Sequence, residues 1–122
     1  MMTANLWSER STCKRMKVGV VITNLEMTNI VSIGYNGGAK GDTNNSCTGE
    51  TGNCTCLHSE INALIKPRSL DGKIMFITHL PCLMCSKAIT NAGIQKIYYR
   101  NDYRDRSGLK LLQKLKIKTV RI

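Results

Sequence analysis

Two short segments contain the residues that could do chemistry. The first holds His58 and Glu60, and the second holds Cys82 and Cys85 directly after Pro81. One imidazole and two thiolates form a three-ligand zinc set, which leaves the fourth position free for water, as in catalytic rather than structural sites. Glu60, two residues after the first ligand, offers a carboxylate to the same site.

Both segments have the pattern of a helix start. Pro81 suits the first helical position, where its missing N–H is no loss, and Cys82 and Cys85 then share one helix face. The exposed N–H groups and the dipole at a helix start favour thiolates. His58 opens an apolar-periodic run, and first-turn side chains tilt toward the helix N-terminus. We therefore expect the two helix starts to face one metal ion.

The spacing H-x-E followed by P-C-x-x-C is the signature of zinc deaminases, in which the Glu moves protons and is not a ligand. Two other interpretations stay open. Cys82 and Cys85 alone fit a thioredoxin-like redox pair. A closed structural zinc site would instead use four thiolates, those of Cys54, Cys56, Cys82 and Cys85, but it would leave Glu60 and Pro81 without a role.

The elements that position these segments follow from hydrophobic periodicity. Apolar runs predict strands at residues 18–23, 30–35, 73–78, 94–99 and 117–122. Helices are predicted at residues 6–16, from just after His58 to about residue 66, and at residues 81–91 and 107–116, with Gly93 and Ser107 as cap residues. The first two strands should pair antiparallel, and the later alternation of helix and strand predicts parallel strands. We therefore expect an α/β fold with about five strands.

Length and composition predict a single domain over residues 1–122. No apolar run reaches the ~20 residues of a membrane span, and the N-terminus lacks a secretory pattern, so we expect no membrane association and a cytoplasmic protein. There, the six cysteines are expected to bind metal rather than to form disulfides.

The formal net charge of +10 suits an anionic partner, either a nucleotide phosphate or nucleic acid. The chain has one Trp, one Phe and four Tyr, and so few aromatic residues argue against a surface on which nucleic-acid bases stack. The composition therefore favours a small nucleotide.

Several motifs together carry a more specific resemblance. They are Arg10-Ser11-Thr12-Cys13 ahead of residues 17–22, Gly34-Tyr35-Asn36-Gly37, His58-Ser59-Glu60-Ile61-Asn62-Ala63, and Pro81-Cys82-x-x-Cys85 with Ala92-Gly93-Ile94 and Tyr99 downstream. On these motifs, which span nearly the whole sequence, the chain resembles the deoxycytidylate (dCMP) deaminase family of phage or viral type. Ser59 stands where the family usually has Ala. The resemblance implies the three-layer α-β-α, cytidine-deaminase-like fold.

The same resemblance implies zinc-dependent hydrolytic deamination of dCMP to dUMP. It assigns the zinc to His58, Cys82 and Cys85 and proton transfer to Glu60. It also assigns a substrate pocket, formed by Asn36, Gly37, Thr78, His79, Leu80 and Tyr103. The phosphate needs cationic or N–H donors, and the spacing of the candidates does not select among Arg15, Lys17 and Arg104.

The loop at residues 36–54 is long for a small domain and should be functional or tied down. By its similarity to phage-type dCMP deaminases, we expect a second, structural zinc that is held by Cys13, Cys47, Cys54 and Cys56. Family members are typically homohexamers that dCTP activates and dTTP inhibits, although this chain is short for the family and lacks the usual Pro in the loop.

Other functions stay open at this point. One is a deaminase of tRNA or single-stranded DNA, which the net charge permits and which should bind polynucleotide in a salt-dependent way. Another is deamination of dCTP in place of dCMP. A third is a non-catalytic zinc-binding module, for which Glu60 would be dispensable. For a viral protein, the expected location is the host cytosol.

Overall fold

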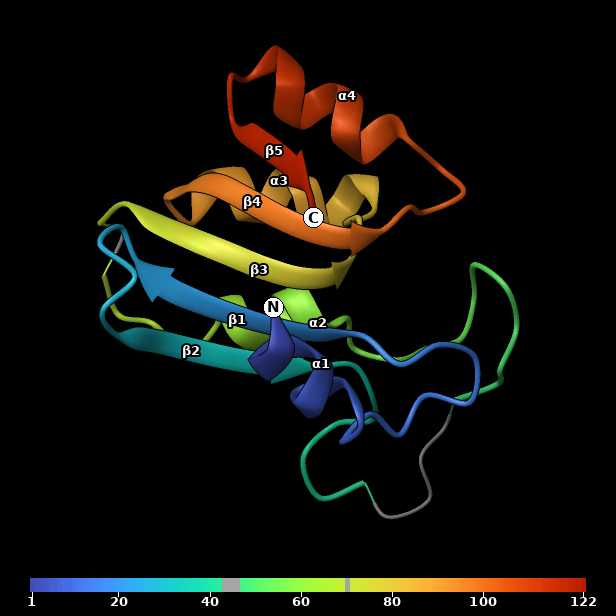
Figure 1. Ribbon diagram of the computed structural model, residues 1–122. Helices are drawn as coiled ribbons and strands as arrows, with labels where there is room; N and C mark the ends of the chain where they lie inside the picture. The colour runs from blue at the N-terminus through green and yellow to red at the C-terminus, as the bar shows by residue number, and fades with distance from the viewer. Residues whose placement is uncertain (43–46, 70) are drawn as a thin grey trace.

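A computed structural model describes residues 1–42, 47–69 and 71–122. Its centre is a five-stranded sheet with the strand order β2-β1-β3-β4-β5 (Figure 1). The strands are β1 (Gly19–Asn24), β2 (Ile30–Tyr35), β3 (Lys73–His79), β4 (Ile94–Asn101) and β5 (Lys118–Arg121). They confirm the five strands that the apolar runs predict. Residues 43–46 of the predicted long loop lie outside the described part of the chain.

The sheet is mixed, as expected. β1 pairs antiparallel with β2, its hairpin partner, and also antiparallel with β3. β3, β4 and β5 are parallel to one another. Each parallel connection therefore carries a crossover helix, which brings the chain from the end of one strand back to the start of the next.

Helices cover both faces of the sheet. The helix α1 (Met2–Ser8) approaches β1 so closely that a side chain at Gly19 would collide with the α1 backbone. A side chain at Gly34 of β2 would collide with the backbone of α2 (Ser59–Leu64). Gly34 pairs with Val20, the neighbour of Gly19, and successive strand residues point to opposite faces. α1 and α2 therefore lie on opposite sides, and Figure 1 shows α1 in front of the sheet with α2 behind it.

The two crossover helices lie on the same side as α2. They are α3 (Leu83–Asn91), which packs against α2, and α4 (Ser107–Lys114), which packs against α3. Beneath them lies the hydrophobic core, whose buried residues include Val20, Ile22, Met75, Ile77, Ile89, Ile97 and Leu112. The result is the predicted three-layer α-β-α architecture.

The first helix differs from its prediction. The sequence pattern predicts a helix at residues 6–16, whereas α1 ends at Ser8. The cause is a long-range contact, because the Asn36 side chain accepts a hydrogen bond from the Val18 N–H at 2.8 Å and donates one to the Met16 carbonyl at 2.7 Å. These bonds hold the segment after α1 in a non-helical path, which local periodicity could not reveal.

The starts of α3 and α4 also differ in detail. Pro81 precedes the N-cap residue Cys82 rather than occupying the first helical position, and the Cys82 sulfur accepts from the Cys85 N–H at 3.5 Å. At α4 the capping acceptor is Asp105 rather than Ser107. The Asp105 carboxylate accepts hydrogen bonds from the Ser107 N–H at 2.8 Å and from the Ser107 hydroxyl at 2.9 Å.

No helix in the described ranges has the length and apolar content that crossing a membrane requires.

Candidate active site

The two helix starts bring the predicted ligands together. His58 is the N-cap residue of α2, and Cys82 is the N-cap residue of α3. The His58 Nδ1 atom lies 3.3 Å from the Cys85 sulfur and 3.7 Å from the Cys82 sulfur. The three ligand atoms all lie within 4.8 Å of one another.

These spacings fit a tetrahedral zinc ion. Zn–S bonds of ~2.3 Å and Zn–N bonds of ~2.0 Å, set at the tetrahedral angle, place a nitrogen and a sulfur ligand about 3.5 Å apart. The two observed nitrogen–sulfur distances, 3.3 and 3.7 Å, bracket that value. His58, Cys82 and Cys85 therefore have the donor types and the separation that a three-ligand zinc site needs.

The thiols in this group are electrostatically linked. Hydrogen bonds from Cys85 and from His58 lower the pKa of the Cys82 thiol to about 4. The hydrogen bond to Cys82, together with burial, raises the pKa of Cys85, and the hydrogen bond to Cys82 also raises the pKa of His58. The three groups therefore share their protons through these hydrogen bonds. A divalent cation would displace those protons and take their place.

Glu60 lies next to the ligand group and is almost fully buried. The Ser59 hydroxyl donates a hydrogen bond of 2.9 Å to its Oε2 atom. Burial raises the pKa of Glu60 above the ordinary carboxyl value, and the hydrogen bond from Ser59 is one of the interactions that oppose this rise. A raised pKa makes a carboxylate a better proton acceptor, and a carboxyl that can accept and return a proton is a general acid–base group.

A cavity of about 280 Å³ adjoins this group and is lined by His58, Glu60 and Cys82. Its volume is close to the lower end of the range for small-molecule sites. Four of the predicted substrate residues also line it, namely Asn36, His79, Leu80 and Tyr103. The lining further includes residues that the motifs did not single out for the pocket, namely Met16, Val18, Gly52, Asn53 and Thr55, and the phosphate candidate Arg15.

Two predicted substrate residues lie outside the cavity lining. The Gly37 backbone pairs with Leu57, and a side chain at Gly37 would collide with Thr12. The Thr78 hydroxyl accepts a hydrogen bond of 3.1 Å from the Gly19 N–H. Each is the chain neighbour of a lining residue, Gly37 of Asn36 and Thr78 of His79.

Asn36 supports the cavity and also faces it. Its Oδ1 atom accepts from the Ser11 hydroxyl at 2.7 Å and from the Val18 N–H at 2.8 Å, which fills both lone pairs. Its Nδ2 group donates to the Met16 carbonyl at 2.7 Å. Among the described residues the second Nδ2 hydrogen has no partner, so it is available to a ligand.

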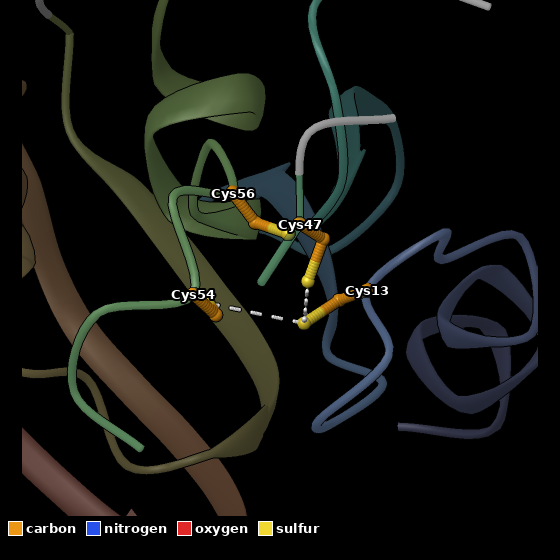
Figure 2. A group of neighbouring side chains, drawn as sticks. All are labelled: Cys13, Cys47, Cys54 and Cys56. Atoms are coloured by element: carbon orange, nitrogen blue, oxygen red, sulfur yellow. Dashed lines mark hydrogen bonds between the residues drawn. The ribbon is translucent and has the colours of Figure 1, made fainter. Parts of the chain in front are cut away.

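A second group of metal ligands flanks the same cavity. It contains Cys13, Cys47, Cys54 and Cys56, whose sulfur atoms lie within 4.8 Å of one another. Figure 2 shows these side chains converging, Cys13 from the segment after α1 and the other three from the loop that precedes α2. The Cys13 sulfur lies 3.8 Å from that of Cys47 and 3.9 Å from that of Cys54.

The spacing of this second group also suits zinc. Two sulfurs on one tetrahedral zinc are about 3.8 Å apart. A hydrogen bond from the Lys14 N–H lowers the pKa of Cys47 to about 7, whereas burial raises the pKa of Cys56. Cys54 and Cys56 belong to this group and not to that of Cys82 and Cys85. The division into two groups excludes the single closed site that would have joined those four cysteines.

Comparison with known families shows to which family the chain belongs. Residues 1–101 match the family model described as the cytidine and deoxycytidylate deaminase zinc-binding region. The chain belongs to this family. The matched range includes both segments of the His58, Cys82 and Cys85 group, and the zinc-binding description of the family agrees with their donor set. Zinc is therefore the metal that the family description names and that this donor set fits.

Individual relatives are consistent with the family. The deoxycytidylate deaminase of Schizosaccharomyces pombe is 34% identical over 118 residues, covering 84% of this chain and 36% of that protein. The deoxycytidylate deaminase of Mycobacterium phage D29 is 30% identical over 110 residues, covering 75% of this chain and 84% of that protein. This chain thus spans little more than a third of the fission-yeast relative but most of the phage relative.

A solved structure shows the same fold. The crystal structure of dCMP deaminase from the cyanophage S-TIM5, in complex with dCMP and dUMP, matches with a TM-score of 0.89 and 41% sequence identity. The match covers 99% of this chain and 92% of that one. The five-stranded sheet and its helices therefore form the cytidine-deaminase-like fold that the sequence predicts.

Proposed function

We propose that this protein catalyses the zinc-dependent hydrolytic deamination of dCMP to dUMP. The observation that carries the proposal is the position of Glu60, a buried carboxyl in the wall of the cavity that adjoins the His58, Cys82 and Cys85 group. A structural zinc site has no use for such a carboxyl. The choice of dCMP rests on the likeness to the deoxycytidylate deaminases, of which the cyanophage enzyme was solved with dCMP and dUMP.

The zinc ligands, Glu60 and Ser59 each have a separate role in the proposed reaction. His58, Cys82 and Cys85 would hold the zinc, which when bound would supply an acidified water as the nucleophile. Glu60 would take one proton from the attacking water and deliver it to N3 of the cytosine ring. It would then transfer the remaining proton of the new C4 hydroxyl to the amino group, so that the C4–N bond breaks, ammonia leaves and the C4 carbonyl forms. The Ser59 hydroxyl orients the Glu60 carboxyl through its hydrogen bond.

The remaining cavity residues would hold the substrate. The free Nδ2 hydrogen of Asn36 is available to a hydroxyl of the sugar, since the other polar positions of this side chain are used by the protein. His79 and Leu80 would contact the base, and Tyr103 would lie near the sugar and the phosphate. Leu80 is buried and offers an apolar surface to a flat ring.

The second cysteine group is proposed as a structural zinc site. Four thiolates without an open position are a structural pattern, and the described contacts join the loop before α2 to the segment after α1. Metal binding there would hold two segments of the cavity wall together, because Cys13, Cys54 and Cys56 all line the cavity. The expected zinc content is therefore two per chain.

The proposal is tested by following the ultraviolet absorbance of cytosine after adding the purified protein to dCMP, CMP, dCTP or deoxycytidine. Loss of the band with dCMP, and slow or no loss with the other three, is the expected result. Equal loss with dCTP would show a different substrate range. No loss with any of the four would overturn the proposal and favour a tRNA or single-stranded DNA substrate, which the net charge of +10 would suit.

Assembly and regulation follow from the resemblance alone, whereas the single domain and the cytoplasmic location follow from length and composition. A single domain, a homohexamer, activation by dCTP, inhibition by dTTP and a cytoplasmic location stay predictions. Sedimentation with and without each nucleotide tests the assembly and its dependence on the effectors.

A further inference from the structure

The four-cysteine group is accessible to solvent on one side. Cys54 and Cys56 are partly exposed, whereas Cys13 and Cys47 are buried. Cys13, Cys54 and Cys56 also line the cavity beside the candidate active site, and Cys47 does not. A small oxidant that approaches this group therefore reaches the sulfur atoms on the loop before α2 sooner than the buried sulfur of Cys47.

One partly exposed sulfur has a close partner from another segment. The Cys54 sulfur lies 3.9 Å from that of Cys13, which comes from the segment after α1 (Figure 2). A disulfide bond is ~2.05 Å long, so these two atoms need to approach each other by about 2 Å to form one. The Cys13 and Cys47 sulfurs are as close, at 3.8 Å, but both residues are buried. Cys13 and Cys54 are thus the pair that combines access with proximity.

The loop at Cys54 has a backbone conformation that depends on its surroundings. Thr55 has a φ of 59°, in the left-handed region that a β-branched residue rarely adopts. Such a conformation persists only where neighbouring contacts hold it. Thr55 is flanked by two members of the cysteine group, so loss of the metal would remove a restraint on each side. Residues 52–56 all line the cavity, and a change in this loop therefore changes the cavity wall.

The other thiol pair is less suited to oxidation. Cys85 is buried, and the third ligand of its group is the imidazole of His58. Two thiolates balance the double positive charge of zinc, whereas four thiolates exceed it. The sulfur atoms of the four-cysteine group therefore keep more electron density. Since the thiolate is the species that attacks oxidants, the four-cysteine group should react first.

We propose that Cys54 is an oxidation site at which a hydroperoxide forms a disulfide with Cys13, releases the structural zinc and weakens nucleotide binding. The Cys54 sulfur attacks one peroxide oxygen, the O–O bond breaks, and hydroxide leaves. The Cys13 thiolate then attacks the Cys54 sulfur and displaces a second hydroxide as the S–S bond forms. Two electrons pass from the two sulfurs to the peroxide, and two protons from solvent convert both hydroxides to water.

The disulfide would connect metal release to the cavity. It removes two of the four ligands, and the loop is no longer held by Cys47 and Cys56 through a shared ion. The effect on the nucleotide rests on the proposed deamination of dCMP. Coupling between two sites typically changes an affinity by about 5- to 150-fold. By the same linkage, bound dUMP should raise the affinity of the four-cysteine group for zinc by an equal factor.

The test treats the zinc-loaded protein with hydrogen peroxide. A chromogenic chelator follows the released zinc, peptide mass spectrometry maps the disulfides, and calorimetry measures dUMP binding before and after oxidation. Cys54→His keeps a zinc ligand and removes the proposed site of attack. Cys56→His is the matched control, because it replaces the other partly exposed thiol and leaves the pair of Cys13 and Cys54 intact. Elemental analysis gives the zinc content of each protein before treatment.

The unmodified protein is expected to release one zinc per chain, to form the disulfide between Cys13 and Cys54, and to bind dUMP about 5- to 150-fold more weakly. Dithiothreitol and added zinc should reverse all three changes. Cys56→His should respond in the same way. Cys54→His should keep its zinc at the peroxide concentration that releases zinc from the other two proteins.

Several results would overturn the inference. A first disulfide between Cys82 and Cys85, or between Cys54 and Cys56, would contradict the assigned pair. Unchanged dUMP affinity in the oxidised protein would contradict the coupling to the cavity. If Cys54→His does not hold zinc, the disulfide map of the unmodified protein decides. If the unmodified protein does not deaminate dCMP, the proposed function fails, and zinc release with the disulfide map still decides whether Cys54 is the oxidation site.

Discussion

The Ser59 hydroxyl donates a hydrogen bond of 2.9 Å to Oε2 of Glu60, and both side chains are buried. The alanine that the family usually has at this position could not make this bond. It restrains the carboxyl in a site where burial raises the pKa of Glu60. Ser59, the residue that departs from the family pattern, therefore contacts the carboxyl that is proposed to move the protons.

Replacing Glu60 with glutamine should remove activity without removing the metal. The amide cannot carry protons, and loss of general acid–base catalysis reduces rates by about 10²- to 10⁴-fold. The three zinc ligands are unchanged. The check is kcat for dCMP together with the zinc content by elemental analysis. An unchanged kcat in Glu60→Gln would show that Glu60 has no catalytic role and would favour a non-catalytic zinc-binding module.

Replacing Cys47 with serine should reduce the zinc content from two to about one per chain and lower the melting temperature. It removes one thiolate from a four-ligand group that joins the loop before α2 to the segment after α1. Cys85→Ser is the matched control, because it should remove the other zinc and abolish turnover. A zinc content of one per chain in the unmodified protein would contradict the second site.

Replacing Asn36 with alanine should destabilise the fold as well as weaken substrate binding. The Val18 N–H would be left buried without a partner, and an unsatisfied buried donor costs about 1–3 kcal/mol. Urea denaturation measures the change in the free energy of unfolding. Asn91→Ala, at an exposed position in α3, should change it by less than about 0.5 kcal/mol. Equal effects of the two substitutions would contradict the role of Asn36 in holding this segment.

The cap of α4 should make stability depend on pH. Hydrogen bonds from the Ser107 N–H and hydroxyl lower the pKa of Asp105 in the folded protein. Ionised Asp105 therefore stabilises the fold at pH values above its unfolded pKa, and the contribution is lost as the pH falls through the folded pKa. Asp105→Asn should lower the melting temperature at pH 7, and the difference from the unmodified protein should shrink on acidification. Glu26→Gln, in an exposed turn, is the control, and a difference that does not vary with pH would contradict the cap.

Local patterns were sufficient to predict the strands and the ligand group. The β-branched runs at residues 18–23 and 73–78 are buried strands, and the spacing of His58, Cys82 and Cys85 places the ligands at two helix starts. Periodicity failed at residues 9–16, because the path of that segment is set by hydrogen bonds with Asn36, which lies about twenty residues further along the chain.

Sequence spacing could not separate Arg15 from Lys17 or Arg104, because the distinction depends on which side chain lies in the cavity wall and which has a partner elsewhere. The grouping of Cys54 and Cys56 with Cys13 rather than with Cys82 is also a tertiary contact, and only the resemblance to phage-type deaminases indicated it beforehand.

The most direct test of the central claim is deamination of dCMP in water enriched in oxygen-18, with mass spectrometry of the nucleotide product and assay of the released ammonia. The predicted result is dUMP that carries one oxygen-18 atom and one ammonia per dUMP, with neither formed by Glu60→Gln. Recovery of unchanged dCMP from the zinc-loaded protein, or equal product from Glu60→Gln, would contradict the account.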